Sequence, residues 1–142
     1  MKKTIISIAI ILISINLHAQ TEKDIFTYKG IVALFEKKIE YVYDVIKEDF
    51  LSEKNTYQRT LLFLSDKEII IAGQKYLVQS QSTEKEYDKP SDTYFDFTEY
   101  ECTTDDGVEY IIEVTKSKNI IYGVRIYFWD KNKNLNKVSY QH

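Results

Sequence analysis

Carboxylates are the most plentiful reactive groups in this sequence, with 22 Asp and Glu residues among 142. Four of them flank one expected turn: Glu101, Asp105, Asp106 and Glu109. If a hairpin folds around residue 105, Glu101 lies near Glu109, and like charges opposed across strands cost up to about 1 kcal/mol. A calcium ion takes oxygen ligands and would offset that repulsion. We expect no cofactor, with calcium at these four residues as the alternative, because their spacing matches no ligand loop.

A pair of carboxylates can also hydrolyse a glycosidic bond, with one group acting as acid and the other as base or nucleophile. The candidates are Asp96, Glu99, Glu101 and Glu113. Acids on outward strand positions are common, and a chain of this length offers little room for a sugar cleft. A carboxylate-based hydrolase acting on polysaccharide is therefore an alternative to the main prediction.

The sequence lacks the residues that catalysis by histidine or by zinc would need. Of two histidines, His18 lies in the expected leader and His142 is the last residue, where we expect fraying. No interior histidine remains to activate a nucleophile, and one cysteine cannot complete a zinc site. We interpret Cys102 as a buried strand residue, the alternative being a thiol paired with a second chain. We predict no catalytic residues, and hence no enzyme.

Aromatic residues are the other excess, with twelve Tyr, seven Phe and one Trp. Alternation along segment 120–129 places five residues on each face: Ile120, Tyr122, Val124, Ile126 and Phe128 on one, and Ile121, Gly123, Arg125, Tyr127 and Trp129 on the other. One interpretation is that Tyr and Trp bridge core and solvent. The other is a contact surface, because Arg, Tyr and Trp are enriched at binding hot spots. The candidate binding residues are Arg125, Tyr127 and Trp129.

Short runs rich in Ile, Val, Tyr and Phe predict strands from residue 60 onward, at 61–64, 69–72, 76–80, 93–102, 108–115, 120–129 and 138–140. Turns are expected at 65–67, 73–74, 105–107, 116–119 and 131–134, and a polar loop at 79–92 around Pro90. The Asp106-Gly107 step supplies the positive φ that a tight hairpin needs.

Segment 31–50 fits two patterns. Ile39, Tyr41, Tyr43 and Val45 alternate with polar residues as in a strand, yet apolar residues of the segment also fit a helical face. Because β-branched and aromatic residues dominate, we predict two strands that meet near Lys37-Lys38. The fold is then all-β, an antiparallel sandwich or small barrel of six to eight strands. The alternative is an α+β fold with one N-terminal helix at about 30–50 packed on an antiparallel sheet.

The first nineteen residues predict a secretory signal peptide, with positive Lys2 and Lys3, an apolar core at 4–15 and cleavage between Ala19 and Gln20. The core is too short for a membrane span, which needs about 20 residues. We expect residues 20–142 to form a single β-rich domain that is exported, periplasmic or secreted, with no membrane span after cleavage. Acidic residues outnumber basic ones and the two kinds are interleaved, so the sequence shows no basic patch that would bind nucleic acid.

Four features of the second half resemble small exported bacterial β-domain proteins of unknown function. They are the Asp106-Gly107 turn, the alternating strand after it, the apolar strand 120–129 with its aromatic end, and the closing Tyr140. The resemblance implies an exported location and a β architecture, and it implies no active site.

The main prediction of function is an exported, non-catalytic binding module. It would contact a protein partner or a small apolar ligand in the cell envelope or outside the cell. Besides the hydrolase, a further alternative is a structural envelope-associated protein whose strand edges pair with other subunits.

Overall fold

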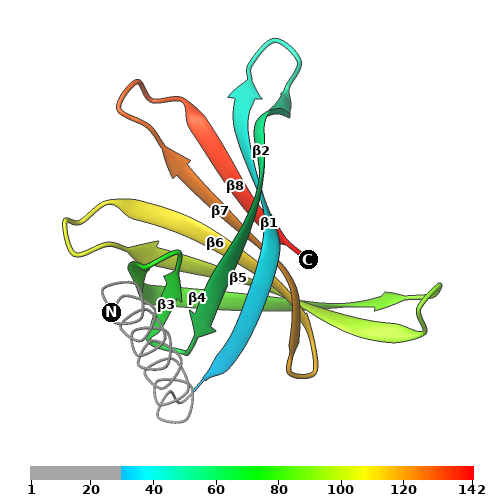
Figure 1. Cartoon of the computed structure of the whole chain (residues 1–142). Helices are drawn as coiled ribbons and strands as arrows, with labels where there is room; N and C mark the ends of the chain where they lie inside the picture. Colours follow the sequence, from blue (N-terminus) through cyan, green and yellow to red (C-terminus); the bar gives the residue numbers. More distant parts are fainter. Residues whose placement is uncertain (1–29) are drawn as a thin grey trace, which may run out of the picture.

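The computed structural model describes residues 30–142; the expected signal peptide and its cleavage site at Ala19 and Gln20 lie outside them. Eight strands follow one another: β1 Ile31–Asp44, β2 Asp49–Leu64, β3 Glu68–Ile71, β4 Gln74–Asp88, β5 Thr93–Thr103, β6 Glu109–Ser117, β7 Ile120–Trp129 and β8 Leu135–Gln141. Each pairs antiparallel with the next, and β8 pairs with β1, so that one sheet closes in a ring (Figure 1). The all-β prediction is confirmed, in its barrel form.

All eight strands send side chains into the barrel interior. The largest fully buried side chains are Phe35, Leu62, Ile69, Ile71, Ile112, Val114 and Val124. The rings of Tyr76, Tyr100 and Tyr140 fill the space between them, and burial raises the pKa of each phenol. An eight-stranded barrel is just wide enough to be filled by its own side chains. A ligand site is therefore to be sought at the ends and on the outer face.

Cys102 belongs to this core, with 2% of its surface exposed. Burial raises the pKa of its thiol to about 12, so the thiol stays protonated and unreactive at neutral pH. The interpretation of Cys102 as a buried strand residue is confirmed.

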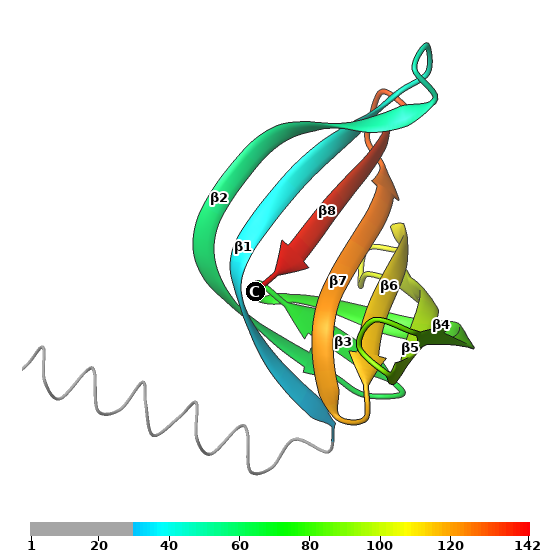
Figure 2. The same cartoon turned by 90° about the vertical axis from the view of Figure 1, so that its right-hand side faces the viewer.

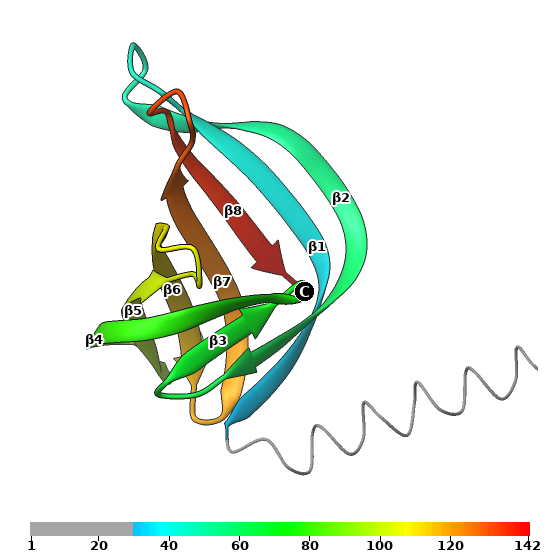
Figure 3. The same ribbon diagram turned by 90° about the vertical axis from the view of Figure 1, so that its left-hand side faces the viewer.

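The shortest strand, β3, joins two of the longest. It pairs with β2 only at Leu62–Leu64 and with β4 only at Gln74–Leu77. Beyond β3, the remaining lengths of β2 and β4 diverge and form long hairpin arms with β1 and β5 (Figures 2 and 3). The barrel is therefore tightly closed at β3 and open where β2 and β4 extend beyond β3.

The first hairpin differs from the sequence prediction. Residues 30–142 contain no helix, so the helical alternative for 30–50 is wrong. The turn near Lys37-Lys38 is wrong too, because both lysines lie inside β1 and pair with β2 and β8. The chain turns instead at 45–48, where the Asp44 carboxylate accepts hydrogen bonds from the N–H groups of Ile46 (2.9 Å) and Lys47 (3.1 Å).

The polar loop predicted at 79–92 is also wrong over most of its length. β4 continues to Asp88, and only 89–92 form a turn. This half of β4 is exposed and shows no apolar alternation, yet each residue from Ser80 to Asp88 pairs with β5. Backbone pairing, rather than burial of one face, holds it as a strand.

β7 has the predicted bounds and only part of the predicted faces. Val124 and Ile126 are buried and Arg125 is exposed, as alternation requires. Toward the start of the strand the pattern fails: Ile121 is buried while Tyr122 is exposed. The pairing steps from Thr115–Gly123 to Lys116–Ile121, so Tyr122 is an extra residue that reverses the faces.

None of the residues that the structure describes belongs to a helix long and apolar enough to cross a membrane.

Candidate functional site

The register of β5 on β6 decides which glutamates meet. Glu99 lies directly opposite Glu113, whereas Glu101 lies opposite Ile111 and Glu109 opposite Thr103. Glu101 and Glu109 are therefore not directly opposed as expected, but they are diagonal neighbours on the same face and line one pocket. The turn is centred on residue 106 instead of 105, and a shift of one residue in the centre moves every partner by two.

β6 and β7 separate at one end of the barrel. Their pairing ends at Ile111–Tyr127, so Glu109 and Tyr110 on β6 are no longer paired with Phe128 and Trp129 on β7. Figure 1 shows the β5–β6 and β7–β8 hairpins diverging on this side. A pocket of about 380 Å³ lies here, which we call the fork pocket. Its volume is within the range of small-molecule sites.

Both faces of the sheet border the fork pocket, because the strands part at this point. From the outer face come Glu101, Ile111, Tyr127 and Trp129, and from the core face Cys102, Tyr110 and Phe128. Trp129 is 64% exposed and Ile111 42% exposed. Such large apolar side chains left in water at the edge of a cavity are typical of a binding site.

The inner wall of the fork pocket is held in place by ring contacts. The ring of Tyr110 packs edge-on against Tyr76, with centroids 5.0 Å apart, and tilts against Phe128 at 5.8 Å. Edge-to-face and tilted ring pairs at such distances are favourable beyond their burial alone. The aromatic wall therefore exists before any ligand arrives.

A β-bulge in β4 completes the rim of the fork pocket. The pairing steps from Val78–Cys102 to Ser80–Glu101, which leaves Gln79 as the extra residue. The amide of Gln79 donates a hydrogen bond to the Thr103 hydroxyl (3.1 Å), and the Ser80 hydroxyl donates one to the Glu101 carboxylate. Bulges are frequent beside functional sites because they redirect side chains. Sequence reasoning missed Gln79, which fell within the predicted loop.

The three candidate binding residues share the outer face of β7, but they serve two places. Tyr127 and Trp129 line the fork pocket, whereas Arg125 does not. Arg125 lies beside Glu113, with its Nη1 3.4 Å from Oε2. The Tyr127 hydroxyl donates to the same carboxylate oxygen at 2.8 Å. Burial, and then this carboxylate, raise the pKa of Tyr127 to about 12.

A second, smaller depression of about 240 Å³ crosses the outer face of β4 to β7, and we call it the carboxylate groove. Glu99 and Glu113 face each other in it, with Arg125 on the next strand. Of the four proposed hydrolase residues, these two are brought together. Glu101 lies in the fork pocket, and Asp96 forms an ion pair with Lys85 at 3.6 Å.

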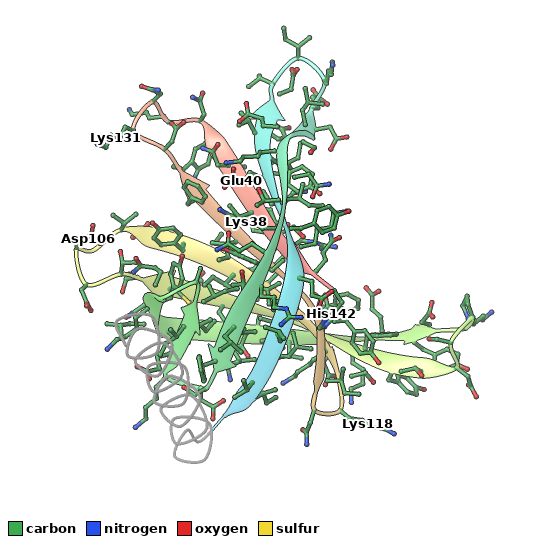
Figure 4. All side chains as sticks on the ribbon, viewed as in Figure 1. Lys38, Glu40, Asp106, Lys118, Lys131 and His142 are labelled. Atoms are coloured by element: carbon green, nitrogen blue, oxygen red, sulfur yellow. The ribbon has the colours of Figure 1, made fainter. Side chains whose placement is uncertain are left out.

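The four proposed calcium ligands are divided as well. Glu101 and Glu109 line the fork pocket, while Asp105 and Asp106 lie on the β5–β6 turn, with Asp106 at its tip in Figure 4. The Thr104 hydroxyl donates a hydrogen bond to Asp106. Among residues 30–142, no three His, Cys, Asp or Glu side chains gather so that they could hold a metal ion.

An aromatic platform continues from Tyr127 onto the first hairpin. Phe50 of β2 packs against Tyr127 with centroids 5.8 Å apart, and against Tyr43 at 5.2 Å. The Lys137 ammonium lies over the rings of Tyr41 (4.3 Å) and Phe50 (4.4 Å). Burial lowers the pKa of this lysine. The pairing of β1 with β8 places Tyr41 opposite Lys137, and no local sequence pattern predicts such a long-range pairing.

His142 is held by contacts with the barrel, although fraying is expected at this position. Its Nε2 lies 3.0 Å from the carbonyl oxygen of Ile121, and its ring packs on Phe35 at 5.1 Å between centroids. This places the imidazole near the middle of the barrel wall in Figure 4, away from the Asp106 turn that borders the fork pocket.

Comparison of the chain with protein-family models, with curated proteins and with solved structures finds no match.

Proposed function

We propose that the chain is an exported, non-catalytic binding module that takes a small ligand with an apolar body in the fork pocket. Export is supported by the leader sequence at 1–19. The observation that carries the proposal is a preformed pocket of about 380 Å³ whose aromatic wall includes Trp129, most of which is exposed to water.

The rest of the barrel favours this site over an interior one. The interior is filled by buried aliphatic side chains and three tyrosine rings. At the fork pocket, by contrast, Ile111 and Trp129 each expose 40% or more of their surface. A ligand that covered these side chains would gain about 25 cal/mol for each Å² of apolar area removed from water.

Trp129 makes the test direct, because it is the one tryptophan in the sequence. Its fluorescence reports on the fork pocket without a label. We expect the neutral apolar dye N-phenyl-1-naphthylamine to quench it in a saturable manner. Trp129→Ala, followed by the fluorescence of the dye itself, should weaken binding at least tenfold, as expected for an aromatic hot spot.

Ile120→Ala is the matched control. Ile120 is an exposed apolar residue at the opposite end of the same strand, and it does not line the fork pocket. Its replacement should leave the affinity for the dye unchanged. Dye binding that is non-saturable, or that both variants weaken equally, would contradict the assignment.

One observation favours a second candidate, a carboxylate-based polysaccharide hydrolase. Glu99 and Glu113 face each other across β5 and β6 in the carboxylate groove. A retaining glycosidase needs two carboxyl groups about 5 Å apart. Release of reducing sugar from cell-wall or plant polysaccharide, lost in both Glu99→Gln and Glu113→Gln, would support this function. No release by the wild-type chain would dispose of it.

A further inference from the structure

We infer that the ligand of the fork pocket carries a positive charge: an ammonium group attached to an apolar body. This rests on the proposed function and adds the chemical class of the ligand. Glu101 and Glu109 supply the charge that would recognise it, and the surrounding rings supply the apolar contact.

The charge of the fork pocket is one-sided. Its lining includes two carboxylates and no Lys, Arg or His. Within residues 30–142 neither Glu101 nor Glu109 forms an ion pair. Lys131 and Lys133 belong to the neighbouring β7–β8 turn and do not line the pocket; Figure 4 shows Lys131 at the far tip of that turn. The negative charge of the pocket is therefore left for a ligand to neutralise.

The rings of the pocket suit the same ligand. Tyr127 and Trp129 on the outer side and Tyr110 and Phe128 on the inner side present aromatic surface to the cavity. The face of an aromatic ring attracts a cation, most strongly when water is partly excluded. Carboxylates combined with rings therefore favour an ammonium group over a neutral or anionic one of the same size.

The molecule already uses this chemistry on the neighbouring aromatic platform. There the ammonium of Lys137 lies 4.3 Å from the ring centre of Tyr41 and 4.4 Å from that of Phe50. Lys137 is also the residue opposite Tyr127 in the β7–β8 pairing, so Tyr127 belongs to both surfaces. Among the described residues, no lysine or arginine lines the fork pocket itself.

The test compares three probes with one apolar tail: octyltrimethylammonium, 1-octanol and octanoate at neutral pH. Binding is followed by Trp129 fluorescence and confirmed by calorimetry. We expect the ammonium probe to bind at least tenfold more tightly than octanol, which corresponds to about 1.4 kcal/mol. Octanoate should bind most weakly.

Two double variants show where the preference resides. Glu101→Gln with Glu109→Gln should reduce the affinity for the ammonium probe to that for octanol measured on the same variant. Asp105→Asn with Asp106→Asn removes the same charge from the adjacent turn, outside the lining. This control should keep the preference. Single variants and a melting curve for each protein guard against loss of the fold.

Each outcome of this test supports or contradicts the inference. Equal affinities for the three probes in the wild-type chain would overturn the charge preference and leave the proposed function standing. Loss of the preference in both double variants would assign it to net charge and overturn the role of the pocket glutamates. If no probe binds, the proposed function and the inference fall together.

Discussion

The fork pocket is lined by two glutamates and the carboxylate groove by three, and the two sites differ in the partners that the chain gives these carboxylates. In the groove, Glu113 is engaged by Arg125 and by the Tyr127 hydroxyl. In the pocket, Glu101 accepts one hydrogen bond from Ser80, and Glu109 forms no ion pair within the described residues.

This difference follows from register. Glu113 lies opposite Arg125, so the cation of β7 reaches the groove and leaves the fork pocket without one. A carboxylate that the chain neutralises itself contributes to the sheet, whereas one without a cationic partner is available to a ligand. The role of each glutamate therefore depends more on which side chains contact it than on its residue type.

The largest expected effect separates the two faces of β6. Ile112 is fully buried in the barrel core, whereas Ile111 is 42% exposed at the fork pocket. Ile112→Ala should lower the free energy of unfolding by about 2 to 5 kcal/mol. Ile111→Ala should lower it by less than about 1 kcal/mol while weakening dye binding. Urea unfolding followed by circular dichroism measures both; equal losses would contradict the stated faces.

Arg125→Ala tests whether the arginine offsets the negative charge of the carboxylate groove. Its removal leaves Glu99 and Glu113 opposed without the cation, at a cost of about 1 kcal/mol in low salt and less in high salt. Arg59→Ala, at an exposed arginine on β2, is the control and should have little effect. Dye binding at the fork pocket should persist in both variants. A loss of binding in Arg125→Ala would instead join the two sites into one.

Tyr127 connects the two sites, and its titration reports on the groove. Glu113→Gln should lower the pKa of Tyr127 from about 12 toward its ordinary value of 10, because the carboxylate no longer opposes the phenolate. Burial keeps part of the shift. Tyrosine ring carbon chemical shifts followed by NMR across alkaline pH measure the change; an unaltered pKa would mean that burial alone sets it.

The same shift predicts how stability depends on pH. The folded state holds the Tyr127 proton more tightly than the unfolded chain, so this contribution is present below about pH 10 and is lost as pH rises toward about 12. Tyr127→Phe should therefore flatten the alkaline fall in stability relative to the wild-type chain. Parallel curves for the two proteins would contradict the assignment.

The smallest expected effect concerns calcium. Because Glu101 and Glu109 lie at the pocket and Asp105 and Asp106 on the turn, millimolar calcium should shift the melting temperature by less than about 1 °C. Magnesium serves as the control for ionic strength. A larger shift specific to calcium would show that the turn closes onto the pocket glutamates.

Sequence patterns predicted the strands that bury one face and missed those that do not. Segment 120–129 has its predicted bounds because its aliphatic residues favour a strand. The exposed halves of β2 and β4 carry polar residues on both faces, and pairing alone holds them. No local pattern distinguishes such a strand from a polar loop.

The candidate site shows the same division. That Tyr127 and Trp129 share a face follows from alternation, and it was predicted. That Glu99 faces Glu113 depends on where the β5–β6 turn is centred, and that Gln79 reaches the rim depends on a bulge. Both features depend on how two strands align, so the residue types alone do not predict them.

The four-residue β3 has a consequence for how the molecule behaves in concentrated solution. It closes the ring through three residue pairs on one side and four on the other, so its detachment is the least costly local opening of the sheet. Detachment would uncover Ile69 and Ile71 and free the backbone of the adjoining strands. Exposed strand edges template pairing with other chains. Backbone amides of β3 should then exchange with deuterium before those of β6 and β7, and the onset of aggregation should follow the rate of this opening.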